Sequence, residues 1–273
     1  MPMIRVNGTA LYYEDTGGSG APIVFSHGLL WNTTLFAPQI AALKDRYRCI
    51  AYDHRGQGRS ADDAARAIDM NTVTEDAAAL IEALEVSPVH FCGLSLGGIV
   101  GMRLAISRPE LVRSLVLLGT TADPEPSKLK YQILNLIFRH FGMKSVVKAI
   151  MPALYGKTAL TDPARADDRL DWANQLAANR RSVWRAVNGV LARESIYEYL
   201  GRICAATLVA VGDEDVATTP AMAERIARAI GGAKFVVIPR AGHASTLEQP
   251  AAVTVAIAAF LDAQKSGARS AAA

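Results

Sequence analysis

Short runs of β-branched and aromatic residues alternate along the chain with longer segments whose apolar residues recur at helical spacing. The strand-like runs lie at 10–15 (ALYYED), 22–26 (PIVFS), 47–53 (YRCIAYD), 88–92 (PVHFC), 114–119 (SLVLLG), 207–212 (TLVAVG) and 234–239 (KFVVIP). From 22–26 onward these runs are apolar on both faces, which is typical of parallel strands covered by helices. The pattern predicts an α/β fold, with a mostly parallel central sheet flanked by helices.

One long segment interrupts this alternation. Residues 122–200 have a helical pattern and no convincing strand, most clearly at 128–151 and 171–196. We therefore expect an α/β core formed by 1–121 and 201–265, with a helical cap inserted at 122–200. The last residues, 266–273, offer little to bury and are expected to form a flexible tail.

Composition narrows the class of protein. The chain has 273 residues, of which 51% are hydrophobic and 20% charged, and its net charge is +3. Because Lys and Arg form no dense block, we expect no nucleic-acid partner. The N-terminus does not have the pattern of a secretory signal, and the uncharged runs are too short or too glycine-rich to span a bilayer. These features predict a soluble, cytoplasmic protein with no membrane partner.

The stretch GLSLG at 93–97 places a serine between two glycines, directly after a strand-like run and before a helical pattern. On such a turn the backbone of Ser95 is strained, and the small flanking residues let the strand and the helix approach closely. The turn exposes the hydroxyl of Ser95 as a candidate nucleophile. The N–H of Leu96, at the start of the helix, would stabilise an oxyanion.

A serine nucleophile needs a base, and the base needs an orienting acid. Among the five histidines, His243 lies in a loop just after the last strand-like run, where a side chain can reach over the carboxyl edge of the sheet. The loop after 207–212 offers three acidic residues. We expect Asp213 to shape the turn, Glu214 to be solvated, and Asp215 to orient His243. No grouping of His and Cys residues has metal-ligand spacing, so no metal site is predicted.

Two further stretches complete the pattern. In FSHGLLWN, at 25–32, the backbone N–H of Leu29 is the candidate second oxyanion donor, and YDHRGQGRS, at 52–60, is a glycine-rich turn after a strand. With GLSLGG, GDED and GHASTLEQP following in this order, nearly the whole chain resembles the α/β-hydrolase superfamily. It is similar in particular to small capped serine carboxylesterases and 3-oxoadipate enol-lactonase-like hydrolases.

The resemblance implies acyl transfer to Ser95, followed by hydrolysis of the acyl-enzyme, on a small-molecule ester or lactone and without a cofactor. A carboxylesterase is favoured. An enol-lactone hydrolase and a C–C bond hydrolase of the same fold remain alternatives, as does a ligand-binding receptor or interaction module. The sequence does not give the oligomeric state.

Apolar residues near the predicted site are candidates for the substrate pocket: Trp31, Ile137, Phe138, Phe141, Met151 and Leu154. The cap also has a surplus of basic residues. We consider two interpretations: a solvated helical face, or an arginine from NRRSVWR (Arg180, Arg181 or Arg185) that pairs with a carboxylate of the substrate.

Overall fold

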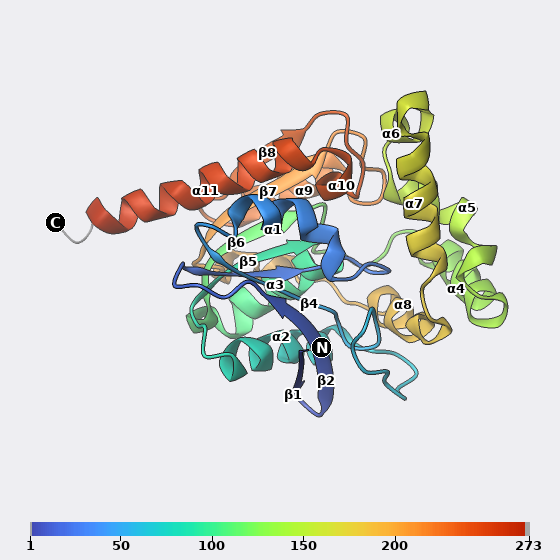
Figure 1. Cartoon of the computed structure of the whole chain (residues 1–273), viewed down its shortest axis with the longest axis horizontal. Helices are drawn as coiled ribbons and strands as arrows, with labels where there is room; N and C mark the ends of the chain where they lie inside the picture. Colours follow the sequence, from blue (N-terminus) through green and yellow to red (C-terminus); the bar gives the residue numbers. More distant parts are fainter. Residues whose placement is uncertain (1, 271–273) are drawn as a thin grey trace.

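The computed structural model describes residues 2–270 and contains one eight-stranded sheet in the order β1-β2-β4-β3-β5-β6-β7-β8 (Figure 1). Strands β3 to β8 run parallel to one another, whereas β2 pairs antiparallel with both β1 and β4. The strands are β1 (Met3–Val6), β2 (Thr9–Asp15), β3 (Pro22–Ser26), β4 (Arg48–Tyr52), β5 (Val89–Leu94), β6 (Val112–Leu118), β7 (Ala206–Gly212) and β8 (Lys234–Ile238).

Helices cover both faces of the sheet, because side chains along the central strands alternate between two apolar cores. In β3, Val24 joins the core beneath α2, α3 and α9, whereas Ile23 and Phe25 join the core beneath α1 and α11. These helices are α1 (Ala37–Leu43), α2 (Met70–Ala83), α3 (Leu96–Ser107), α9 (Pro220–Ala229) and α11 (Pro250–Ser270), with the short α10 (Ser245–Glu248) preceding α11. The fold confirms the predicted α/β class.

Five helices between β6 and β7 form a cap beside the sheet, at the right of Figure 1. They lie inside the interval predicted for it: α4 (Lys128–Phe141), α5 (Val147–Leu154), α6 (Lys157–Thr161), α7 (Ala166–Ala177) and α8 (Trp184–Leu191). Short 3-10 turns connect several elements: η1 (Thr33–Phe36), η2 (Pro109–Leu111), η3 (Met143–Ser145), η4 (Pro163–Arg165), η5 (Arg181–Val183) and η6 (Tyr197–Arg202).

The two ends of the chain differ from the sequence-based expectation. Strand β1 was not predicted, because its four residues are too short a run for alternation to be recognised. The predicted tail at 266–273 overlaps α11, which continues through Ser270, since Ala, Gln, Lys and Arg favour helix. Residues 271–273 lie outside the described residues. Within 2–270, no helix combines the length and hydropathy that crossing a membrane requires.

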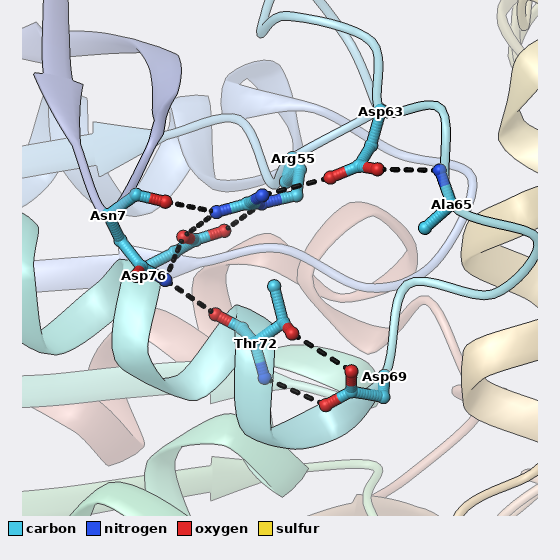
Figure 2. A network of polar contacts seen from close by, with 7 residues as sticks. All are labelled: Asn7, Arg55, Asp63, Ala65, Asp69, Thr72 and Asp76. Carbon is cyan, nitrogen blue, oxygen red and sulfur yellow. Dashed lines mark hydrogen bonds and ion pairs between the residues drawn. The ribbon is translucent and has the colours of Figure 1, made fainter.

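A buried ion-pair network holds the loop that follows β4 (Figure 2). Arg55 donates to both carboxylate oxygens of Asp76 on α2, at 2.8 and 2.6 Å, to Asp63 at 2.9 Å, and to the backbone oxygen of Asn7 at 2.7 Å. These contacts join the turn between β1 and β2, helix α2 and the loop. The loop carries Asp53, whose Oδ1 accepts from the N–H of Thr33 at 2.7 Å. The network therefore supports the turn after β3 that carries Leu29.

Candidate functional site

Ser95 lies on a sharp turn between β5 and α3. Its φ of 54° is in the left-handed region, which a residue with a side chain rarely adopts. The turn is possible only because Gly93 and Gly97 lack side chains. A Cβ on Gly93 would lie 2.2 Å from the backbone of Gly97, and a Cβ on Gly97 would lie 1.9 Å from the oxygen of Ser26. Thr120 secures the turn by donating to the backbone oxygen of Ser95 at 2.7 Å.

His243 and Asp215 form a buried pair on the loops that follow β8 and β7. Nδ1 of His243 lies 2.9 Å from Oδ2 of Asp215. Oδ1 of Asp215 accepts from the N–H groups of Ala217 and Thr218, at 2.9 and 2.8 Å. Oδ2 also accepts from the hydroxyl of Thr218 at 2.7 Å. These four contacts fix the carboxylate, so Nδ1 of His243 carries a hydrogen and Nε2 is free to act as a base.

The environment of His243 tunes its basicity. Burial disfavours the charged imidazolium, but the charge and hydrogen bond of Asp215 outweigh it, so the pKa of His243 is raised above its ordinary value of 6.5. The pair is closely confined. Gly119, at the end of β6, has no side chain, and a Cβ there would lie 3.2 Å from Oδ2 of Asp215 and 3.4 Å from Nδ1 of His243.

The turn after β3 orients the predicted second oxyanion donor. Nε2 of His27 accepts from the N–H of His54 at 3.0 Å, so its Nδ1 carries a hydrogen and donates to the oxygen of Gly28 at 2.7 Å. The backbone N–H of Trp31 donates to the same oxygen at 3.2 Å. Because C=O and N–H point in opposite directions in a trans peptide, the N–H of Leu29 faces away from these donors. Among residues 2–270 it has no protein acceptor.

Leu30, the next residue of this turn, is held on both sides. Leu30, which has a φ of 73°, donates its N–H to the side chain of Gln57 at 2.9 Å. Its carbonyl oxygen accepts from Asn179 of the cap at 2.9 Å. Burial lowers the pKa of both His27 and His54, so these rings are neutral and serve the turn as hydrogen-bonding groups.

Ser95, His243 and Leu29 line one pocket between the core and the cap, with a volume of about 160 Å³. Leu96 occupies the first position of α3, where the N–H has no partner within the helix. The rest of the lining is predominantly apolar. It includes Trp31, Phe138 and Leu154 of the predicted pocket residues, together with unpredicted residues of α4, η3, α5 and α8: Leu134, Met143, Val146, Ile150, Ala153, Val187, Val190 and Leu191.

Three predicted pocket residues do not line it. Ile137 and Met151 are half-buried neighbours of Phe138 and Ile150, and successive residues of a helix point about 100° apart. Phe141 is 73% exposed at the end of α4. Apolar spacing showed that α4 packs on one face, but it did not show which face.

The pocket also has a polar side. Glu125 and Arg193 line it and contact each other at 3.3 Å. Arg193 donates in addition to the oxygens of Asp123 and Val190, each at 2.9 Å. Its guanidinium therefore already contacts three acceptors. By contrast, none of the arginines of NRRSVWR lines this pocket; Arg180 donates to the oxygen of Ser60 and pairs with Asp62.

Two glutamates connect the loops of the site to α6 of the cap. Glu214 was expected to be solvated, but it accepts from the N–H of Thr158 at 2.7 Å and from its hydroxyl. Glu248 accepts from the N–H groups of Gly156 and Gly242, at 2.8 and 3.0 Å. Burial raises the pKa of Glu248 to about 7. Asp213 was expected to shape its own turn, but its side chain accepts instead from the N–H of Ala241, in the loop after β8, at 3.3 Å.

Sequence reasoning missed Thr218, Asn179 and Glu248. Thr218 lies three residues after Asp215, just before α9, and this spacing is typical of a side chain that folds back on an acidic turn residue. It was the one signal available. Asn179 and Glu248 act on partners 149 and 92 positions away, and no local pattern reveals contacts at that separation.

Comparison with known proteins places this geometry in a family. The model of the "Alpha/beta hydrolase family" matches residues 23–257. RutD of Variovorax paradoxus, which is named as a carbamate hydrolase, is 31% identical over 258 residues, covering 92% of this chain and 96% of the relative.

Two solved structures have nearly the same fold. The enol-lactonase from Burkholderia xenovorans superimposes with a TM-score of 0.88 at 27% identity, covering 96% of this chain and all of the other. The thermophilic esterase from Thermogutta terrifontis superimposes with a TM-score of 0.89 at 27% identity, covering 97% of this chain and 99% of the esterase. These matches agree with the resemblance that the motifs indicated, and the chain belongs to the alpha/beta hydrolase family.

Proposed function

We propose that this protein is a serine carboxylesterase that hydrolyses neutral esters, lactones included, through Ser95, His243 and Asp215. The observation that carries the proposal is the His243–Asp215 contact of 2.9 Å beside a pocket that Ser95 also lines. Membership of the hydrolase family supports it, as do neighbours described as an esterase and an enol-lactonase.

In the proposed reaction, Nε2 of His243 takes the hydroxyl proton as Ser95 Oγ attacks the ester carbonyl. The carbonyl oxygen becomes anionic and accepts from the N–H groups of Leu29 and Leu96. Collapse of the tetrahedral intermediate breaks the ester bond, and the imidazolium protonates the leaving alcohol. Water, deprotonated by His243, then attacks the acyl-enzyme, releasing the acid and restoring Ser95. Every proton passes through His243, and Asp215 stabilises its charged form.

The pocket favours an uncharged, apolar acyl group. Its wall is built from Leu, Val, Ile, Met and Phe side chains. Its one lining cation, Arg193, already contacts Glu125 and two backbone oxygens. A substrate carboxylate would lose its hydration and would have to compete with Glu125 for the charge of Arg193. This argues against an acidic enol-lactone, and the same apolar wall makes a small carbamate a poorer fit.

The test compares two p-nitrophenyl esters of similar length, one of an alkanoic acid and one a half-ester with a free distal carboxylate. We expect kcat/KM to be at least about tenfold higher for the neutral ester, since an unpaired carboxylate in the pocket costs more than 1.4 kcal/mol. A preference for the half-ester that disappears in Arg180→Ala, Arg181→Ala or Arg185→Ala would instead support the lactonase.

The number of substrate molecules converted by each protein molecule distinguishes an enzyme from a receptor. An esterase converts substrate in large excess over protein, whereas a receptor that retains the three residues would release one equivalent of p-nitrophenol and stop. A C–C bond hydrolase would leave both aryl esters nearly untouched. Either result would contradict the proposal.

A further inference from the structure

The outer face of α4 carries a row of exposed apolar side chains. Leu129, Ile133 and Leu136 are 71%, 53% and 56% exposed, and their spacing of four and three residues puts them on one side of the helix. Single exposed apolar residues are ordinary, but a row along one helix marks an interaction surface. We call Leu129, Ile133 and Leu136 the α4 stripe.

Positive charge surrounds the α4 stripe. Residues 126–161 contain no Asp or Glu and six basic residues, all exposed: Lys128, Lys130, Arg139, Lys144, Lys148 and Lys157. At about 100° per residue, Lys130 borders the stripe on one side, and Lys128 and Arg139 border it on the other. The whole chain has a net charge of only +3, so the remainder of the protein is negative and this segment is a distinct basic region.

The acidic residues of the cap nearest to α4 in sequence are Asp123 and Glu125, and both are paired, with Arg225 at 2.8 Å and with Arg193 at 3.3 Å. Helix α7 carries Asp167, Asp168 and Asp171 in its first half. That end of α7 begins beside α6, whereas α4 packs against α8 and η3 at the opposite end of the cap (Figure 1). Asp168 is also paired with Arg165. These carboxylates therefore do not neutralise the border of the stripe.

We propose that the α4 stripe docks on the surface of an anionic phospholipid membrane. A helix that lies in the interface inserts apolar side chains below the headgroups and keeps Lys and Arg at the level of the phosphates. The composition and geometry of α4 match this arrangement. The proposal concerns binding at the surface and does not depend on the activity of Ser95.

Charge and shape favour this occupant over two others. A second copy meeting the stripe about a twofold axis would bring the same cations together. An acidic protein partner would need a surface of about 800 Å² on each side, whereas the stripe is one convex row of three side chains. A lipid surface needs neither a complementary groove nor a large contact.

The opposite face of α4 lines the pocket through Tyr131, Leu134, Asn135 and Phe138. Docking would therefore bring the pocket to within about one helix diameter, roughly 10 Å, of the lipid. Lipophilic esters dissolved in the membrane would be concentrated beside the pocket.

The experiment measures co-sedimentation of the full chain with vesicles of phosphatidylcholine alone or mixed with phosphatidylglycerol. We expect binding only to the mixed vesicles. Raising salt from about 0.1 to 1 M should release the protein, because the screening length falls from about 10 to 3 Å. Equal binding to neutral vesicles, or no binding at low salt, would overturn the proposal.

Matched variants locate the contact. Leu129→Gln and Leu136→Gln should each lower the partition coefficient by about tenfold, since each removes one inserted apolar side chain. Leu170→Gln and Val255→Gln, at sites 61% and 67% exposed elsewhere, should have no effect, and thermal unfolding checks that every variant folds. If the controls and stripe variants bind alike, the stripe is not the contact. A dimer in solution that the stripe variants dissociate would show that a second copy covers it.

Discussion

Replacing Asp215 by Asn tests whether this carboxylate sets the position of the hydrogen on His243. Two backbone N–H groups, of Ala217 and Thr218, donate to Oδ1 at 2.9 and 2.8 Å, and Nδ1 of His243 faces Oδ2 at 2.9 Å. An Asn side chain must keep its oxygen where the two N–H donors are. Its NH₂ group then faces His243.

That orientation changes the tautomer of the ring. The amide would donate to Nδ1, so the hydrogen of neutral His243 would move to Nε2, the atom that must accept the proton of Ser95. Loss of the correct tautomer in a triad of this kind lowers kcat by about 10⁴-fold, which corresponds to about 5 kcal/mol of transition-state stabilisation. The fold should be preserved, because Oδ1 keeps both of its N–H donors.

The assay measures kcat and kcat/KM on the neutral p-nitrophenyl ester for Asp215→Asn and the control Asp213→Asn. Asp213 is exposed and accepts from Ala241 at 3.3 Å, so its variant should remain within a few-fold of the wild type. If Asp213→Asn were severely impaired and Asp215→Asn nearly normal, the wrong acid has been chosen. If both were active, neither Asp213 nor Asp215 would orient His243.

Three further outcomes are expected. Ser95→Ala should lower kcat by roughly 10⁴- to 10⁶-fold without loss of fold, and a phosphonate ester should label Ser95 alone; labelling of the Ala variant would contradict the assignment. The apparent pKa of the acid limb of the kcat/KM–pH profile should lie above the ordinary His value of 6.5, because the pKa of His243 is raised. An apparent pKa below 6.5 would mean that the effect of burial on His243 outweighs that of Asp215. Between the ordinary pKa of 4.5 and about 7, folded Glu248 holds a proton that the unfolded chain has released, so its contribution to stability decreases as pH rises, by up to about 1.4 kcal/mol per unit. Urea unfolding across this range should show a shallower decrease in Glu248→Gln than in wild type, and parallel curves would refute the assignment.

The elements that position the candidate site could be predicted because their signals are local. Strand β5 ends at Leu94, Ser95 forms the turn, and α3 begins at Leu96. Backbone constraints within the five residues 93–97 set this arrangement. His243 and Asp215 follow their strands directly, so the parallel order of the sheet brings them to one edge. The sequence favoured Asp215 over Asp213 and Glu214 because it lies farther out on the loop. The contact between Asp215 and His243, across 28 residues, comes from the structure.

The pocket wall was less predictable because helical periodicity does not say which side faces inward. Helix α4 is apolar on both sides: Phe138 lines the pocket, whereas Ile133 and Leu136 are exposed. A pattern with two apolar faces leaves the choice to tertiary contacts. The sequence likewise did not show which arginine of the cap faces the pocket. Arg193 lines it, whereas the arginines of NRRSVWR do not.

The contacts between the cap and the core are concentrated at the loops of the candidate site. Glu214 neighbours Asp215 in sequence, Glu248 contacts the N–H before His243, and both accept from the start of α6. Asn179 holds the carbonyl of Leu30, one residue beyond the candidate oxyanion donor. The cap is thus attached at the loops that carry the candidate base, the candidate acid and the candidate oxyanion donor. Helices between these attachment points, α4 among them, are free to change their outer surface while the alignment of Ser95, His243 and Leu29 is maintained.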